Sequence, residues 1–134
     1  MAGEIIINDG GAPARILPFI ANDTIAAGDY VGLTSNLQIE PINVSGAKGL
    51  GVSLTAATSG NVVNVVTGKG VILSTFCSGT IASGAELTMG TTDMYLEAAT
   101  TVQKQKAEAV AIYVDTALVG GATIAPSLQK VVFN

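Results

Sequence analysis

Residues 24–33 read TIAAGDYVGL, and residues 80–89 read TIASGAELTM. The two stretches share Thr, Ile, Ala and Gly at the same relative positions. In each stretch a glycine, Gly28 or Gly84, stands third in a predicted four-residue turn. A type II turn requires a positive φ at this place, which glycine adopts without a Cβ clash. The sequence therefore predicts the same turn twice, each time between two strands.

The similarity continues beyond these turns. Lys48 begins KGLGVSL in the first half, and Lys106 begins KAEAVAI in the second half at a similar spacing. The segments TSGNVVNVV (58–66) and VGGATIAPS (119–127) follow at a slightly longer offset. A repeated order of turn, strand, loop and strand indicates a duplicated supersecondary unit. The repeated residues are therefore predicted to determine the fold.

The chain from residue 15 onward predicts short strands. Aliphatic and β-branched segments alternate with turn residues about every eight to twelve positions, which is typical of a β-sandwich or β-barrel. We therefore expect an all-β fold, a small sandwich or barrel with a duplicated unit and at most one short helix, near residues 102–107. Residues 15–134 are expected to form a single β domain, and residues 1–14 an extended N-terminal arm.

Two local patterns refine this expectation. The segment RILPFIA contains Pro18, which lacks a backbone N–H and therefore indicates an edge strand or a bulge. The segments NVVNVV (61–66) and GVILSTF (70–76) are almost continuously apolar, so we expect them to be covered on both faces. The residues TGKG (67–70) between them predict a hairpin turn.

The composition limits the possible partners. Hydrophobic residues make up 49% of the 134 residues and charged residues only 12%, with a net charge of −4. So few charges favour a chain whose surface is covered by other proteins, as in an oligomer or a larger assembly, although a soluble surface rich in Ser, Thr and Asn is the alternative. The six basic residues are scattered, which argues against nucleic acid and against a polybasic membrane anchor.

The residues needed for common chemistry are missing or dispersed. The chain has no histidine, and its acids form no recognisable motif. We therefore expect no enzyme activity, no metal and no cofactor. The single cysteine, Cys77, is predicted to be a packed thiol, and with no recognisable secretory signal it fits synthesis in a reducing cytoplasm. The apolar stretch 109–125 predicts two strands and a turn, because Asp115 and two glycines interrupt it.

Two groups of residues carry a resemblance to a known family. The first is the run Ala27-Gly28-Asp29-Tyr30-Val31. The second is Gly51-Val52 followed by Ala57, Gly60, Val62, Val65 and Gly70-Val71. Over residues 24–134 the chain resembles the small capsid decoration proteins of tailed bacteriophages, which are also called cement or head-stabilising proteins.

This resemblance implies a structural function. It implies a virion protein, made in the host cytoplasm, that binds the outside of the major capsid protein lattice after expansion and stabilises the head against the pressure of packaged DNA. It also implies a homotrimer or a dimer. The alternative is another phage structural or adhesive β module, such as a tail or fibre component that binds a host glycan. An exposed cluster of Tyr30, Tyr95 and Tyr113 would favour that alternative.

Two segments are predicted to contact the capsid or another subunit. In the arm, Ile5, Ile6 and Ile7 are too apolar for a free tail, so they either add a strand to a neighbour's sheet or form an edge strand of their own sheet. In the second segment, ARILPF, the predicted contact residues are Arg15, Pro18 and Phe19. Arg15 is the only arginine of the chain, and arginine is enriched in interfaces, although a solvated surface arginine is the alternative.

Overall fold

The computed structural model describes residues 5–8, 15–42, 49–67, 69–90, 95–106, 109–115, 117–121 and 127–133. Within these residues the chain is built almost entirely of strands, with one short helix, as predicted. The elements are β1 (Ile6–Asn8), β2 (Arg15–Ala21), β3 (Tyr30–Ser35), β4 (Gln38–Pro41), β5 (Gly51–Ser53), β6 (Val62–Thr67), β7 (Ile72–Cys77), β8 (Gly79–Ile81), β9 (Glu86–Met89), β10 (Leu96–Ala98), α1 (Thr101–Gln105), β11 (Ala111–Tyr113), β12 (Leu118–Gly121) and β13 (Ser127–Phe133).

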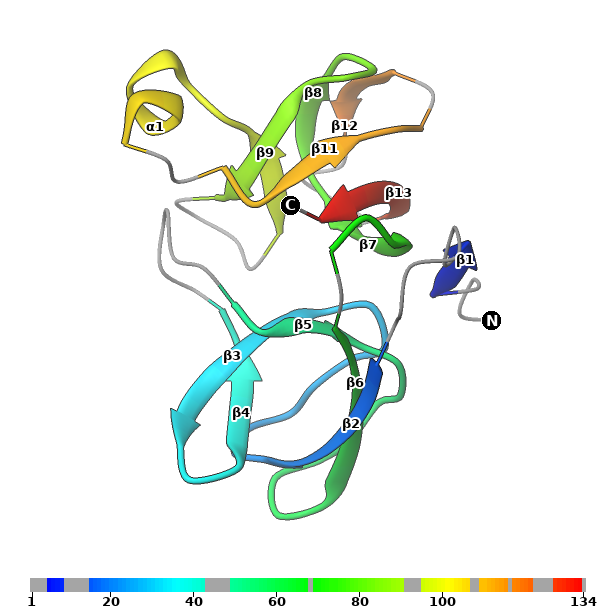
Figure 1. The fold of residues 1–134 in the computed structure, drawn as a ribbon, viewed down its shortest axis with the longest axis vertical. Helices are drawn as coiled ribbons and strands as arrows, with labels where there is room; N and C mark the ends of the chain where they lie inside the picture. The colour runs from blue at the N-terminus through cyan, green and yellow to red at the C-terminus, as the bar shows by residue number, and fades with distance from the viewer. Residues whose placement is uncertain are drawn as a thin grey trace.

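The strands form two five-stranded barrels. The first barrel has the strand order β2-β4-β3-β5-β6 and is closed by the pairing of β2 with β6. The second barrel has the order β7-β10-β9-β11-β13 and is closed by the pairing of β7 with β13. The first barrel fills the lower half of Figure 1 and the second barrel the upper half. Closure of both sheets removes most of the exposed strand edges that promote aggregation.

The two barrels have the same topology, which confirms the predicted duplication. The strands correspond in chain order, β2 to β7, β3 to β9, β4 to β10, β5 to β11 and β6 to β13. In each barrel the first of these strands pairs in parallel with the third, β2 with β4 and β7 with β10. The other pairs in each ring are antiparallel. The similarity of the two turns therefore reflects two copies of one barrel. The match of residues 58–66 to 119–127 is wrong, because β6 corresponds to β13 and β12 pairs with β8 outside the second barrel.

Hydrogen bonds around the repeated turns match pair by pair. Gly28 N donates to Ser53 O at 2.8 Å, and Gly84 N donates to Tyr113 O at 2.7 Å. The turns themselves close with N···O distances of 3.1 Å in the first copy and 3.0 Å in the second. Gly28 has a φ of 95° and Gly84 a φ of 85°. The prediction that both glycines serve a turn with positive φ is confirmed.

The second repeated segment requires a correction in register. The similarity of KGLGVSL to KAEAVAI aligns Val52 with Val110. In the structure Val52 pairs with Tyr30 and Val66, whereas Ile112 makes the equivalent pairs with Glu86 and Val132. The true counterpart of Val52 is therefore Ile112. The alignment from sequence still assigns side chains to the correct face, because a shift of two residues preserves the alternation of a strand.

The two barrels share a hydrophobic core. Side chains that point outward from the first barrel, among them Tyr30, Val52 and Val66, are buried together with residues of the second barrel. Tyr30 stacks on Phe133, with 5.4 Å between the ring centroids. The inside of the first barrel forms a separate cluster of Phe19, Ala21, Ile25, Val31, Ile39, Val63 and Val65. Val65 and Val66 thus face different cores, so this end of NVVNVV is covered on both faces as predicted, whereas Val62 is exposed.

The hairpin predicted at TGKG (67–70) is wrong. β6 pairs with β2 and β5, whereas β7 pairs with β1, β10 and β13. The segment instead connects the last strand of the first barrel to the first strand of the second. Its glycines resemble those of a hairpin because a sharp change of direction is needed in both cases, and Gly70 has a φ of 79°.

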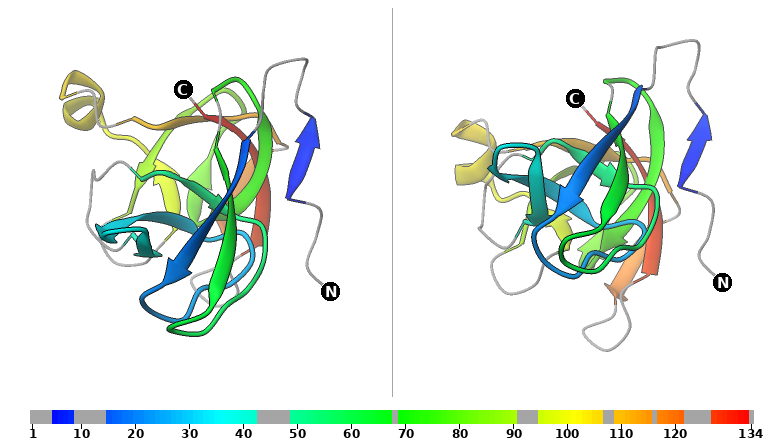
Figure 2. Two further views of the ribbon diagram at one scale, coloured as in Figure 1. Left: turned by 60° about the horizontal axis from the view of Figure 1, so that its bottom comes forward. Right: turned by 90° about the horizontal axis from the view of Figure 1, so that it is seen from below.

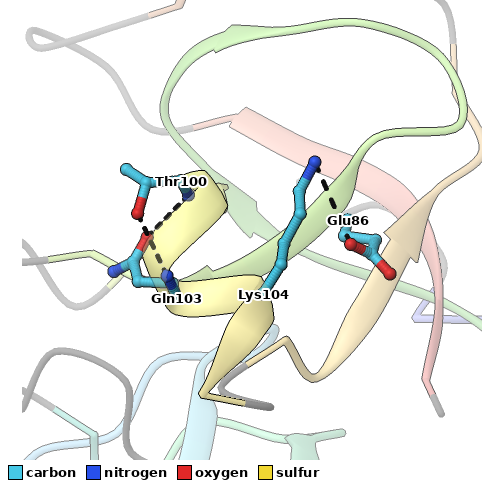
Figure 3. A network of polar contacts seen from close by, with 4 residues as sticks. All are labelled: Glu86, Thr100, Gln103 and Lys104. Carbon is cyan, nitrogen blue, oxygen red and sulfur yellow. Dashed lines mark hydrogen bonds and ion pairs between the residues drawn. The ribbon is translucent and has the colours of Figure 1, made fainter.

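The short helix α1 lies in the connection between β10 and β11, close to the predicted place. It begins at a capping box, in which Thr100 Oγ1 accepts from Gln103 N at 3.3 Å and Gln103 Oε1 accepts from Thr100 N at 2.8 Å (Figure 3). Lys104 of this helix lies 3.9 Å from the Glu86 carboxylate. No helix among the described residues is long and apolar enough to span a membrane.

Candidate functional site

The predicted arm strand lies on the chain's own sheet. β1 pairs with β7 in antiparallel orientation, and Ser74 N donates to Ile5 O at 2.7 Å. Ile5 is buried, Ile6 is half-buried against the same core, and Ile7 lies within β1. Figure 2 shows β1 at one side of the molecule in both views. The remainder of the predicted arm, residues 1–4 and 9–14, lies outside the described residues, so a contact of the arm with another subunit stays a prediction.

The contact residues predicted in the second segment, ARILPF, differ in their exposure. Arg15 and Pro18 are exposed, whereas Phe19 is buried inside the first barrel. In the pairing of β2 with β6, Pro18 lies opposite Asn64. Ser74 has the equivalent position to Pro18 in the second barrel, on β7. Ser74 uses its N–H to bind β1, but Pro18 has no N–H to offer. The edge of β2 is therefore poorly suited to the addition of a strand.

Exposed large hydrophobic side chains are concentrated on the first barrel. They are Ile16, Leu17, Leu33, Leu37 and Val62, whereas the remainder of the described chain contributes Val102 and Val114. Val62 is 61% exposed and stands opposite the half-buried Ile20 on the outer face of β2 and β6. Because exposed apolar patches mark interaction sites, the first barrel is the better candidate for a binding surface.

A second exposed apolar feature is the tip of the β3–β4 hairpin. Leu33 and Leu37 are each 59% exposed there. Leu37 has a φ of 57°, the one positive value among the described non-glycine residues. Its carbonyl oxygen accepts from Ile20 N at 2.8 Å, which holds the tip against the end of β2. A leucine in this conformation costs about 1 kcal/mol, so the tip combines backbone strain with exposed apolar surface.

A cavity of about 460 Å³ lies between the two barrels. Tyr30, Val66, Leu73 and Phe133 line it, and Lys69 is the charged residue among its described lining. Tyr30 Oη accepts from Gly49 N at 2.6 Å, and burial raises the pKa of this phenol. The described lining contains no carboxylate and no thiol that could act as a general base. The titratable groups of its described lining are thus Tyr30, whose hydroxyl is engaged by Gly49 N, and Lys69.

The other buried titratable groups are placed for structure. Asp29 Oδ2 accepts from Ala26 N at 2.8 Å within the first repeated turn, and burial raises its pKa despite this bond. Burial, with a smaller contribution from Asp115, raises the pKa of the Cys77 thiol to about 12. Cys77 is fully buried, as predicted for a packed thiol. Among the described residues no group of three potential metal ligands comes together.

The three tyrosines do not form an exposed aromatic face. Tyr30 and Tyr113 are buried, and Tyr113 Oη donates to Gln129 Oε1 at 2.9 Å. Tyr95 is half-buried and packs edge-to-face on Phe76. No described feature therefore favours the glycan-binding alternative.

Comparison with known proteins shows what fold this is. The structure is similar to the head fibre gp8.5 N base of bacteriophage phi29, with a TM-score of 0.68 over 91% of this chain and 95% of that chain. The two sequences are 14% identical, so the likeness concerns the fold. A scan of protein families finds no match, and none of the curated proteins matches the sequence. The chain thus shares its fold with a structural protein of a bacteriophage head.

Proposed function

We propose that this chain is a non-enzymatic structural protein of a bacteriophage virion that binds the outer surface of the capsid shell. The observation that carries the proposal is the likeness to the phi29 head fibre base over almost the whole of both chains. The duplicated barrels and the few charges agree with a protein that acts by binding.

The proposed partner is the major capsid protein after expansion of the shell. A ligand that binds only the expanded lattice stabilises that state by mass action. Hundreds of symmetric sites on one shell also act together, so each contact needs only modest affinity. The chain then braces the head against the pressure of packaged DNA, with no role for nucleic acid or membrane as a partner.

We assign the shell contact to the tip of the β3–β4 hairpin. Leu33 and Leu37 expose apolar surface there, and the positive φ of Leu37 holds the tip in a conformation that stability alone does not favour. The tip also lies at the end of the first barrel away from the second barrel, where a flat lattice can reach it (Figure 1).

Co-sedimentation with expanded shells tests this assignment. We expect the wild-type chain to pellet with the shells in a saturable manner. The variant Leu33→Asp should bind at least about tenfold more weakly, because it places a charge in an apolar contact. The matched control is Val102→Asp on α1, at a site that is 56% exposed, and it should bind like wild type. Equal binding of all three chains would refute the hairpin tip as the contact, and no binding by wild type would refute the proposed function.

A further inference from the structure

The cavity between the two barrels is lined by residues of both. The first barrel contributes Tyr30 and Val66, and the second barrel contributes Leu73 and Phe133, with Val110 beside them at the start of β11. These side chains are buried, so the wall that they form is largely apolar. The volume of about 460 Å³ lies within the range of sites that bind small organic molecules.

The hydroxyl of Tyr30 is a buried donor that has no acceptor among the described residues. Tyr30 is 4% exposed, and its ring stacks on Phe133. Its Oη accepts from Gly49 N at 2.6 Å, which uses one lone pair and leaves the phenolic proton free to donate. A buried donor without an acceptor is unfavourable. The cavity is therefore suited to a ligand that brings an acceptor to this hydroxyl.

The charge at the cavity is positive. Lys69 lies in the connection between the barrels, is exposed, and forms no ion pair with any described residue. The described lining offers no carboxylate to oppose it. The whole chain has a net charge of −4, so this local positive charge is not a general property of its surface. A lysine beside an unopposed hydroxyl donor favours an anion.

We propose that the cavity binds a small amphiphilic anion, a carboxylate with an aliphatic tail. The carboxylate accepts from the Tyr30 hydroxyl, and the ammonium group of Lys69 supplies the opposite charge. The tail packs against Leu73, Val110 and Phe133. A carboxylate carries acceptors only, so it matches a site whose side chains offer donors.

Such a ligand contacts both barrels at once, because the lining comes from both. It therefore stabilises the folded chain and, in particular, the packing of one barrel on the other. This inference goes beyond the proposed function and does not depend on it, since it is measured on the purified chain without shells.

Calorimetric titration of the purified chain with decanoate, below the concentration at which it forms micelles, tests the proposal. Wild type should bind decanoate in a saturable manner, and decanoate should raise the midpoint of thermal unfolding. Acetate has the carboxylate without the tail, and decyltrimethylammonium has the tail with the opposite charge. Each should bind at least about tenfold more weakly than decanoate, because each lacks one of the two contacts.

Three variants test the assigned contacts. Tyr30→Phe keeps the ring that stacks on Phe133 but removes the hydroxyl, so it should weaken binding by about tenfold. Lys69→Met removes an exposed charge and should weaken binding by about two- to fivefold. Ala109→Phe places a ring in the cavity that Ala109 lines, so it should abolish binding. Circular dichroism should report unchanged folding in each.

Lys104→Met is the matched control, because Lys104 is exposed but lies outside the described lining. It should bind decanoate like wild type. A wild-type chain that does not bind decanoate, or that binds decyltrimethylammonium equally well, would overturn the proposal. Wild-type affinity in Tyr30→Phe, Lys69→Met or Ala109→Phe would overturn the assigned site. Equal losses in Lys69→Met and Lys104→Met would indicate general charge attraction and would also overturn it.

Discussion

Two glycines at equivalent places in the two barrels differ in their surroundings. Both Gly28 and Gly84 have a positive φ, so any L-residue at either place is strained. A Cβ atom at Gly28 would also meet Leu128 and Phe76, whereas at Gly84 it would meet open space. The same residue thus serves the turn in both copies, and in the first copy it also permits the close approach of the two barrels.

Substitution of the two glycines separates these effects. Gly84→Ala should lower the free energy of unfolding by about 1 kcal/mol, from backbone strain alone. Gly28→Ala should lower it by about 2–3 kcal/mol, because overpacking against Leu128 adds to the strain. Urea unfolding at concentrations where the chain is monomeric measures both values. Equal losses would show that the barrel contact tolerates a methyl group at Gly28.

Leu37 is a residue at which stability and the proposed function oppose each other. Leu37→Gly relieves the positive φ of the hairpin tip, so it should raise the free energy of unfolding by about 0.5–1 kcal/mol. It also removes exposed apolar surface, so shell binding should weaken. Thermal unfolding and co-sedimentation of the same preparation check both effects. A variant that is more stable and binds equally well would show that Leu37 has no part in the contact.

Because the thiol of Cys77 is buried, we expect the folded chain to lose free energy of unfolding at alkaline pH. Burial raises the pKa of its thiol in the folded chain from 9.0 to about 12. The stabilisation of the folded state is therefore complete below about pH 9 and is lost as the pH rises toward 12. The slope is about 1.4 kcal/mol per pH unit, so about 2 kcal/mol is lost by pH 10.5.

The variant Cys77→Ala isolates this contribution. Ala21 occupies the equivalent position in the first barrel, so alanine is compatible with the fold. The variant should be less stable than wild type at pH 7 but should lose less stability between pH 7 and pH 10.5. Tyr30, whose pKa burial also raises, is present in both chains and cancels in the comparison. Burial, Asp115 and Cys77 raise the pKa of Tyr113, so the part that comes from Cys77 is removed together with the thiol. Parallel pH profiles of the two chains in urea would contradict the assignment.

At the scale of elements, the sequence predicts the barrels better than their connections. Turns and strands are encoded locally, by Gly28 and Gly84 and by apolar runs such as NVVNVV, so their prediction is correct. The prediction for the connection at residues 67–70 is wrong, because glycine-rich residues mark a change of direction without stating which strands then pair. The packing of Tyr30 on Phe133 could not be predicted, since the two residues are distant in sequence and the pattern gives no relative placement of the barrels.

The contact residues could be predicted only in part. The residue types predict Arg15, Pro18 and Phe19 as contact residues. The structure places Arg15 and Pro18 on the surface and Phe19 in the core. Sequence reasoning misses the exposed Leu33 and Val62 as contact candidates. Leu33 and Val62 lie in strands with ordinary β patterns, and nothing local distinguishes an exposed valine from a buried one.

The strand β1 yields a prediction about the arm. Ile5 is buried in the core beside β7, so Ile5→Ala should lower the free energy of unfolding by about 2–4 kcal/mol. The control Ile16→Ala changes an isoleucine that is half-exposed on β2, and it should cost about 0.5 kcal/mol or less. Urea unfolding of the monomer measures both. If Ile5→Ala instead leaves the monomer's stability unchanged and abolishes self-association, the arm acts on a neighbouring subunit.

At the scale of the whole molecule, the chain is two copies of one barrel, and its exposed large apolar side chains are concentrated on the first copy. The self-association that the sequence predicts would present several hairpin tips to the shell at once. Such linked contacts reinforce one another without any gain in the individual affinities. Loss of the oligomer should therefore weaken shell binding, whereas loss of the tip contact should leave the oligomer intact.

The measurement that tests the central claim most directly is the ratio of bound chain to major capsid protein on expanded and on unexpanded shells. Quantitative co-sedimentation of the purified chain with each kind of shell gives this ratio at saturation. The account predicts a fixed ratio on expanded shells and no saturable binding on unexpanded shells. Equal binding to both would contradict stabilisation of the expanded state, and binding to neither would contradict a role on the capsid surface.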